Sequence, residues 1–200
     1  NILEAARHNK LKRLTYASSI ASHSLTPKSP YMSTLYGAYK LCDENIASIY
    51  YQDWNVPSIG IRPGIIYGIG RDQGLTSKTT IATLAAAAGI PYTIPFSGAI
   101  SALHAGEAAA AFIKAAAIKQ DEAPVFDLNG TSTTVEEWVK IINSIEPDSR
   151  IRITGDSLPF PSNLSDQPIH NYLGKYDKVD LKFGIKQTFT SFRNLLSLNQ

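Results

Sequence analysis

The sequence has few of the features that mark disulfide-rich, membrane-spanning or nucleic-acid-binding proteins. Its single cysteine, Cys42, excludes a disulfide within the chain. The longest weakly polar run, IATLAAAAGI, is too short and too rich in alanine to cross a bilayer. The formal net charge of +2 gives no electrostatic reason to expect binding to nucleic acid or to an anionic membrane. We therefore expect neither kind of partner, and we expect no metal site.

The composition is typical of a globular protein, but the first residues are unusual for the start of a chain. A hydrophobic content of 44% and a charged content of 18% over 200 residues allow one domain with a core, or one domain and a small lobe. The opening segment, NILEAARHNK, starts inside an amphipathic helix without a capping residue or an initiator methionine. This beginning predicts that the natural N-terminal part precedes Asn1 and is absent here.

Helix and strand patterns alternate along the chain. Short apolar runs predict strands near 13–18, 57–62 and 124–128, and a long amphipathic pattern predicts a helix over 33–52. A further helix is expected after Thr76 or Ser77, with one of these hydroxyls as its cap, and a terminal helix from about Thr188 to Leu198. Strands that alternate with helices of this length indicate parallel β-α-β units and hence an α/β fold.

The stretch LYGAYK places Tyr36 and Lys40 four residues apart on the long predicted helix. At this spacing two side chains lie on the same helix face. Alone the signal is weak, because a chain with ten tyrosines produces Tyr-x-x-x-Lys by chance, and a surface tyrosine packed over a lysine stem explains it equally well.

The neighbouring strands strengthen the signal. Ser18 and Ser19 come at the end of the strand before this helix, and Pro63 comes at the end of the strand after it. In an open parallel sheet, ligands bind outside the carboxyl ends of the strands. We therefore expect these residues to meet Tyr36 and Lys40 at one edge of the sheet.

Several blocks resemble a known family. YASSIAS, LYGAYK and IRPGIIYGIGRD are similar to successive signatures of the extended short-chain dehydrogenases/reductases, the NAD-dependent epimerase/dehydratase family, and LHAGEAAAAFIKAA and VFDLNG resemble later ones. The resemblance implies the C-terminal part of a Rossmann-type doubly wound parallel sheet plus a small α+β substrate lobe. It assigns 1–68 and 104–129 to a partial NAD(P)-binding domain that lacks its first strands, and 69–103 and 130–200 to the lobe.

The family chemistry explains the Tyr-Lys spacing. Hydride transfer at a carbinol carbon requires a base for the hydroxyl proton, and a free tyrosine, with a pKa near ~10, is a poor base at neutral pH. A neighbouring ammonium favours the phenolate. The resemblance therefore implies that Tyr36 is the acid/base, that Lys40 supports it and binds the nicotinamide ribose, and that Ser19 orients the reacting oxygen. Pro63 is assigned to the cofactor site, and Ser18 to a strand-end hydrogen bond.

The sequence departs from the family pattern in two places that bear on its ligands. No Gly-x-x-Gly-x-x-Gly phosphate loop is present, and the residue that separates NAD from NADP is also missing, so either cofactor fits. Ile65 stands where many sugar-nucleotide enzymes carry an asparagine. Arg71, with Thr76 and Ser77, forms either an anion-binding site of the substrate lobe or a surface ion pair with a helix cap. A sugar acid fits both Arg71 and Ile65.

We therefore expect a cytoplasmic NAD(P)-dependent oxidoreductase or epimerase that acts on a carbohydrate-like substrate, either a sugar acid or a nucleotide sugar. Dehydrogenation, reduction and epimerisation use the same residues and are not separated by the sequence. The alternative is a non-catalytic nucleotide-binding or regulatory module on the same fold. The resemblance also implies a homodimer, formed through the helix that carries Tyr36 and the helix before it.

Overall fold

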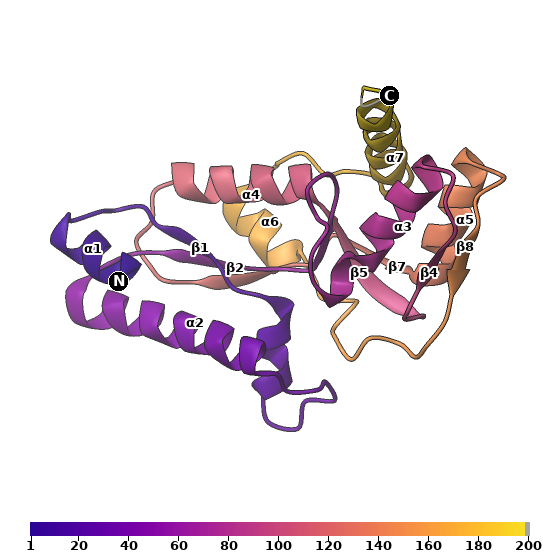
Figure 1. Cartoon of the computed structure of the whole chain (residues 1–200). Coiled ribbons are helices and arrows are strands. Elements are labelled where there is room, and N and C mark those ends of the chain that lie inside the picture. The colour runs from indigo at the N-terminus through magenta and orange to yellow at the C-terminus, as the bar shows by residue number, and fades with distance from the viewer. Residues whose placement is uncertain (199–200) are drawn as a thin grey trace. The chain divides into compact units, whose positions relative to one another are not determined.

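The computed structural model describes residues 1–198, which divide into two units. Unit 1 comprises Asn1–Gly64, Ala108–Asn129 and Pro159–Asp177, and unit 2 comprises Ile65–Glu107, Gly130–Leu158 and the described residues from Lys178 onward. Pro159–Asp177 lies in unit 1, and the division of the chain into a partial NAD(P)-binding domain and a substrate lobe stays a prediction. Figure 1 labels the elements of both units.

Unit 1 is a parallel sheet with helices on both faces. Its elements are α1 (Ile2–His8), β1 (Thr15–Ala17), η1 (Ile20–Leu25), α2 (Leu35–Trp54), β2 (Ile59–Pro63), most of α4 (Ala105–Ala117), β6 (Val125–Leu128) and α6 (Gln167–Leu173). The strand order is β1-β2-β6, and both pairings are parallel. Helix α2 covers one face of the sheet, and α4 and α6 cover the other (Figure 1). The expected parallel α/β fold and its three strands are confirmed.

The central strand β2 is buried on both faces. Ile59, Gly60 and Ile61 are all buried, as expected for a parallel strand covered by helices on each side. Gly60 pairs with Tyr16 of β1, and a Cβ at position 60 would lie 2.6 Å from the Tyr16 hydroxyl oxygen. Only glycine therefore leaves room for the Tyr16 ring beside β2. Burial of that ring raises the pKa of its hydroxyl.

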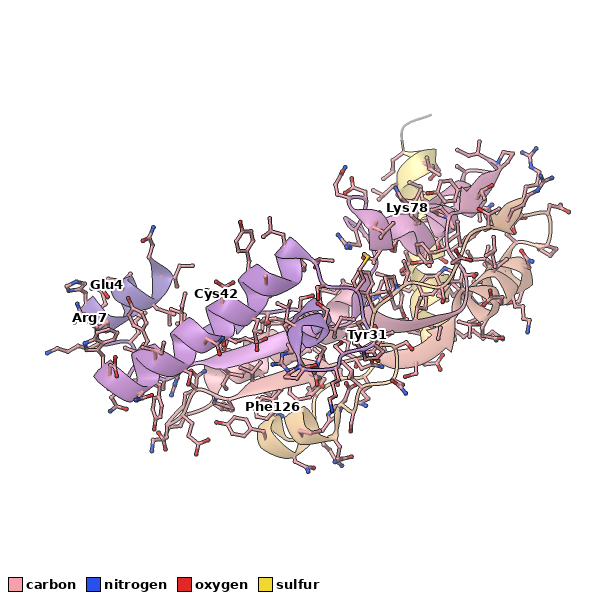
Figure 2. The ribbon with its side chains drawn as sticks, turned by 90° about the horizontal axis from the view of Figure 1, so that it is seen from below. Glu4, Arg7, Tyr31, Cys42, Lys78 and Phe126 are labelled. Carbon is pink, nitrogen blue, oxygen red and sulfur yellow. The ribbon has the colours of Figure 1, made fainter. Side chains whose placement is uncertain are left out.

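Helix α1 is tied to α2 by polar side chains. Glu4 accepts hydrogen bonds from Arg7 on its own helix and from the hydroxyl of Tyr50 on α2, at 2.9 Å from the latter (Figure 2). Hydrogen bonds from Arg7 hold the pKa of the Glu4 carboxyl at about 2. Because the folded-state pKa is lowered, this contribution to stability is present above the ordinary carboxyl pKa and is lost as the pH falls toward 2. The solvent exposure of the group keeps that contribution small.

Helix α2 approaches η1 closely at its first turn. The helix is capped by Thr34, whose hydroxyl oxygen accepts the Gly37 N–H at 3.0 Å. A Cβ at Gly37 would lie 2.5 Å from the backbone oxygen of Ala21 in η1. Gly37 is buried and lets the α2 backbone lie against η1, so its small size serves a contact within the protein.

Unit 2 is built from two small sheets and three helices. Its elements are β3 (Ile65–Tyr67), η2 (Leu75–Ser77), α3 (Lys78–Ala87), β4 (Tyr92–Ile94), β5 (Ala99–His104), the first residues of α4, β7 (Thr131–Thr134), α5 (Val135–Ile145), β8 (Ile151–Ile153) and α7 (Leu181–Ser197). One sheet has the order β3-β5-β7, with β3-β5 parallel and β5-β7 antiparallel. The other pairs β4 with β8 in parallel.

The core of unit 2 centres on Trp138. Its side chain is fully buried, and its indole N–H donates to the hydroxyl oxygen of Thr83 on α3 at 3.2 Å. Its ring meets the Tyr67 ring edge-on, with centroids 4.7 Å apart. Helix α5 presents Trp138 together with Val135 and Ile142, which lie on one face because they are three and four residues away.

Two local predictions about helix ends are wrong. The terminal helix begins at Leu181 and not near Thr188, because the Asp180 carboxylate caps it by accepting the Phe183 N–H at 2.9 Å. Helix α3 has no side-chain cap: Ser77 occupies the N-cap position, but its hydroxyl donates backward to the Gly74 carbonyl at 2.8 Å.

We predict that Gly37→Ala destabilises the protein. Alanine normally favours a helix over glycine by roughly 0.5–1 kcal/mol, but here the added methyl meets a backbone oxygen that cannot turn away. We expect a net loss of about 1–3 kcal/mol, measured as a lower denaturant midpoint. Gly106→Ala on α4 is the control, because its new methyl would lie 3.1 Å from the His104 ring, a milder approach than the 2.5 Å to a backbone oxygen at position 37. An unchanged midpoint for Gly37→Ala would contradict the close contact.

We also predict that Trp138 holds unit 2 together. Trp138→Ala should cost about 3–5 kcal/mol in the free energy of unfolding, because the indole is fully buried. Trp138→Phe keeps an aromatic ring but loses the bond to Thr83, so it should cost less. The exposed Trp54→Phe is the control. Equal midpoints for Trp138→Ala and Trp54→Phe would show that the core is not organised around this residue.

Candidate active site

Ser19 lies where the chain leaves β1 and turns into η1. Its backbone is extended, and its hydroxyl oxygen accepts the Ala21 N–H at 3.2 Å, which makes Ser19 the N-cap of η1. A hydroxyl has one donor and two acceptor positions. The bond from Ala21 uses only an acceptor position, so the Ser19 O–H can donate to the oxygen of a bound molecule.

Tyr36 and Lys40 lie on the first two turns of α2. The Lys40 ammonium is 5.8 Å from the centroid of the Tyr36 ring, and it donates a hydrogen bond to the Ala17 carbonyl at 2.7 Å. Tyr36 is 54% exposed, so its hydroxyl is not used in the core. The structure thus holds a cation beside an accessible phenol, at the end of the strand that leads to Ser19. The approach of Ser19 to the Tyr36 hydroxyl stays a prediction.

Pro63 lies at the same edge of the sheet. It is the last residue of β2 and pairs with Leu128 of β6, while Ala17 at the end of β1 pairs with Ile61. Because the three strands are parallel, their carboxyl ends face the same edge. The expected convergence of the segment ends within unit 1 is therefore present in the backbone.

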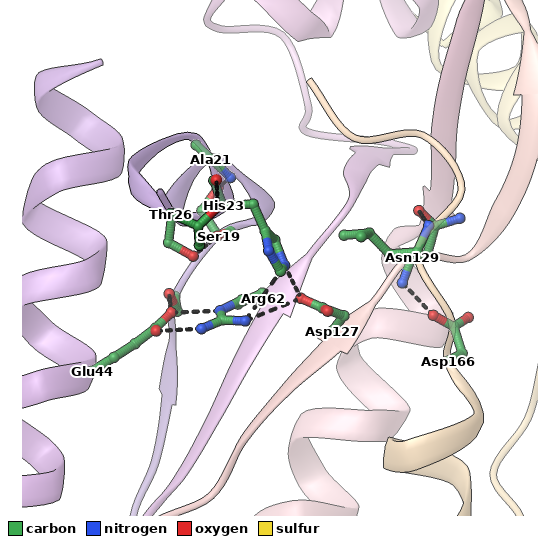
Figure 3. A network of polar contacts seen from close by, with 12 residues as sticks. Ser19, Ala21, His23, Thr26, Glu44, Arg62, Asp127, Asn129 and Asp166 are labelled. Atoms are coloured by element: carbon green, nitrogen blue, oxygen red, sulfur yellow. Dashed lines mark hydrogen bonds and ion pairs between the residues drawn. The ribbon is translucent and has the colours of Figure 1, made fainter. Parts of the chain in front are cut away.

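A cluster of charged side chains that is not among the predicted site residues, apart from Ser18, lies just below this edge (Figure 3). Arg62 of β2 donates two hydrogen bonds to the buried Glu44 carboxylate of α2, at 2.7 and 2.6 Å. The hydroxyl of Ser18 donates to the same carboxylate. On its other side Arg62 lies 3.6 Å from Asp127 of β6, which in turn contacts His23 at 2.7 Å.

The cluster joins α2, β2, β6, η1 and Ser18, the residue that follows β1. The hydrogen bonds to Glu44 raise the pKa of the Arg62 guanidinium, so this cation stays charged at any ordinary pH. Two features of the sequence could have pointed to the cluster. Arg62 interrupts the apolar strand SIGIRPG, and Glu44 follows Lys40 by one helical turn, so both lie where a charge requires a partner.

Arg71, Thr76 and Ser77 lie in unit 2 and bond within their own loop. The Arg71 guanidinium donates to the Gln73 carbonyl at 2.7 Å and to the Thr76 hydroxyl oxygen at 3.0 Å. Ser77 is fully buried, and its hydroxyl donates to the Gly74 carbonyl. The side chain of Arg71 thus holds the loop in shape without an acidic partner among these contacts. The anion-binding role of the three residues stays a prediction.

His104 ends β5 in a position that serves the structure. Its Nδ1 accepts the Gly106 N–H at 3.1 Å at the start of α4, and its ring meets the Tyr67 ring edge-on. Burial lowers the pKa of the imidazole, which favours the neutral ring that this hydrogen bond requires.

Three further observations on the described residues concern metal ligands, membrane-spanning helices and the single cysteine. Within 1–198, no three histidine, cysteine, aspartate or glutamate side chains are grouped as metal ligands would be. No helix in this part of the chain combines the length and the apolar character needed to span a bilayer. Cys42 is a free, exposed thiol on α2 (Figure 2).

Comparison with known proteins supports the resemblance. An uncharacterised 37.6 kDa protein from the cld 5′ region of Escherichia coli O111:H- is 37% identical over 93 residues, which is 42% of this chain and 28% of that protein. The match therefore spans less than a third of the relative's length.

Solved structures share the fold. A GalE-like L-threonine dehydrogenase from Cupriavidus necator matches with a TM-score of 0.84 at 24% identity, over 96% of this chain and 76% of that one. UDP-glucose 4-epimerase from Thermus thermophilus, solved with NAD, matches with a TM-score of 0.78 at 21% identity, over 96% and 67%. At such identities the likeness concerns the fold alone.

The family model described as the NAD dependent epimerase/dehydratase family matches residues 1–127. This match covers more than half of the chain, and the parallel sheet of unit 1 agrees with it. The chain belongs to the NAD dependent epimerase/dehydratase family.

Proposed function

We propose that the whole protein transfers a hydride between NAD(P) and a hydroxyl or carbonyl carbon of a sugar-like substrate. The observation that carries this proposal is the Lys40 ammonium, anchored on the Ala17 carbonyl and held 5.8 Å from the ring of the exposed Tyr36. A phenol with an ammonium beside it is the acid/base arrangement that the family resemblance implies for this hydride transfer.

The role of each side chain follows from the hydrogen-bond donors and acceptors that its contacts within the protein leave unused. In the oxidation direction Tyr36 accepts the proton of the substrate hydroxyl at its phenolic oxygen, while the carbon loses a hydride and forms a carbonyl. Ser19 donates its O–H to the reacting oxygen. The hydrogen bond from the Ala21 N–H occupies one acceptor position of this hydroxyl and leaves its donor unused. In the reverse direction Tyr36 returns the proton to the carbonyl oxygen.

The residues present fit a nicotinamide cofactor. When bound, NAD(P) supplies the acceptor or donor of the hydride. Lys40 has three N–H donors: one bonds the Ala17 carbonyl, and the ammonium also lies 3.8 Å from the Asp43 carboxylate, a distance that leaves donors available for the hydroxyls of a ribose. Pro63 ends β2 at the same edge of the sheet and is our candidate contact for the cofactor.

The substrate is proposed as a sugar acid or a nucleotide sugar. In unit 2, Arg71 is our candidate contact for a carboxylate or phosphate, since its nearest partners are neutral oxygens of its own loop. Thr76 fixes the guanidinium, and the buried Ser77 fixes the loop. Assays should therefore include uronates, aldonates and sugar nucleotides, and also L-threonine, the substrate named for a protein of the same fold.

A homodimer stays part of the proposal. Helix α2 exposes large apolar side chains along its length, including Tyr39, Ile46 and Ile49, which are 63%, 39% and 49% exposed. A contact with a second copy would remove them from water. Sedimentation or light scattering of the whole protein measures this state directly.

We predict that Tyr36→Phe abolishes most turnover and spares the fold. The change removes only the hydroxyl of an exposed ring, and acid/base assistance is typically worth ~10²–10⁴ in rate. Turnover with either cofactor should fall by about that factor, while binding of the cofactor, measured by calorimetry, persists. Tyr39→Phe on the same helix is the matched control and should leave turnover unchanged. Near-normal turnover in Tyr36→Phe would sink the proposal that Tyr36 is the acid/base, whereas a wild type that binds NAD(P) but turns over no tested substrate would favour a non-catalytic nucleotide-binding module.

We predict that Lys40→Met weakens both catalysis and the binding of NAD(P). It removes the charge beside the phenol and the donors available to a ribose, so both kcat and the affinity for NAD(P) should fall. By contrast, Tyr36→Phe should affect kcat alone. Lys119→Met, which removes an 84% exposed ammonium, controls for the loss of charge. A Lys40→Met protein that binds NAD(P) as tightly as the wild type would remove the ribose contact from the proposed function.

A further inference from the structure

The charged cluster below the sheet edge reaches the catalytic segment through Ser18. The Glu44 carboxylate is 6% exposed and accepts hydrogen bonds from three donors: two from Arg62 and one from Ser18. Ser18 is itself buried and immediately precedes Ser19. One carboxylate therefore joins α2, the central strand β2 and the end of β1.

Helix α2 holds the end of β1 at two successive residues. Lys40 donates to the Ala17 carbonyl, and one helical turn later Glu44 accepts from the Ser18 hydroxyl. Residues four apart lie on the same helix face, so the two contacts act from one side. The next residue after these two anchored positions is Ser19.

The other partners of Arg62 keep this arrangement fixed. Arg62 pairs in register with Asp127 of β6, and His23 contacts both, at 2.7 Å from Asp127 and 3.4 Å from the guanidinium. The Glu44 carboxylate cannot turn away without leaving Arg62, because a buried charge that loses its partner is strongly destabilising. Its orientation toward Ser18 is therefore set by the sheet.

We propose that Glu44, held by Arg62, is a positioning residue that acts through Ser18 to set where Ser19 lies relative to Tyr36. The inference rests on the proposed function of Ser19 and Tyr36 and adds the device that aligns them. Glu44 itself touches neither substrate nor cofactor in this proposal. Misplacement of a reacting group by about 1 Å can cost ~10² in rate, so loss of the device should appear in kcat.

The test compares Ser18→Ala with Ser18→Thr in the whole protein. Ser18→Ala removes the link to β1 but leaves both Arg62–Glu44 bonds in place, so the fold should persist. We expect kcat per folded molecule to fall by about 10- to 100-fold, with little change in the affinity for NAD(P). Ser18→Thr keeps a hydroxyl and should restore kcat. Asp53→Asn, an exposed carboxylate change on α2, is the control.

A second pair of variants tests the connection to Glu44. Glu44→Gln should also lower kcat. In the double variant with Ser18→Ala, the change in activation free energy should be smaller than the sum of the changes in the two single variants, because both substitutions remove the same hydrogen bond. Additive effects would overturn the proposal. Where Ser18→Ala does not fold, Ser18→Cys replaces it, because a thiol is only a weak donor; wild-type kcat in that variant would also overturn the proposal.

The outcomes separate this inference from the proposed function. If Tyr36→Phe is inactive but Ser18→Ala keeps wild-type kcat, the inference fails and the proposed function stands. If Tyr36→Phe keeps its activity, the proposed function fails and the inference falls with it. A loss in Ser18→Ala that disappears after correction for the folded fraction, measured by circular dichroism at low temperature, shows a structural role and overturns the inference.

Discussion

The buried ion pair between Glu44 and Arg62 is the constraint on which unit 1 depends. It connects α2, a helix of 20 residues, to the central strand of the sheet. Removing two charges from water costs several kcal/mol for each ion, and only good geometry and additional hydrogen bonds compensate for it. Here Arg62 binds the carboxylate through two nitrogens, and Ser18 adds a third donor. The two parallel N–H bonds from Arg62 to the carboxylate add geometric specificity to the contact between the helix and the strand.

The same helix carries the candidate chemistry at its other end. Lys40 is one turn from Glu44, and Tyr36 one turn further, at the exposed beginning of α2. The ion pair of the buried Glu44 thus fixes the helix on the sheet, and the exposed first turn presents the Tyr36 phenol to solvent. Gly37 lies between Tyr36 and Lys40 and lets the helix pack against η1. The segment that starts with Ser19 and the helix that carries Tyr36 are therefore in direct contact.

The sequence predicts those parts of the structure whose signals are local. Ile59 and Ile61 lie in an apolar run bounded by prolines, which is sufficient to identify a buried strand, and the Tyr36–Lys40 spacing specifies a shared helix face. The contacts of the charged cluster join residues 18, 26 and 104 positions apart, so a local pattern can indicate that Arg62 requires a partner but not which residue the partner is.

Ambiguous local patterns account for the remaining errors and omissions. The segment DLKFGIK contains a glycine and spaced apolar residues, and only the cap by Asp180 shows that it is helical. Helix α6 was missed because Pro168 and its polar neighbours resemble a loop; proline is nevertheless well suited to the first turn of a helix. The roles of Ser19 and Pro63 could be proposed from the sequence only through a family resemblance, since neither residue has a distinctive local pattern. Arg71 was a candidate on local grounds, because it precedes two hydroxyls at a predicted helix start.

The exposed thiol of Cys42 makes α2 accessible to spectroscopy. It is the single cysteine of the chain and lies two residues after Lys40 on the same helix. A maleimide fluorophore or nitroxide therefore attaches at one defined place without any cysteine having to be removed first. A spin label there would report on the local mobility of the helix that carries Tyr36, and its line shape would reveal whether that helix becomes more ordered when a nucleotide is added.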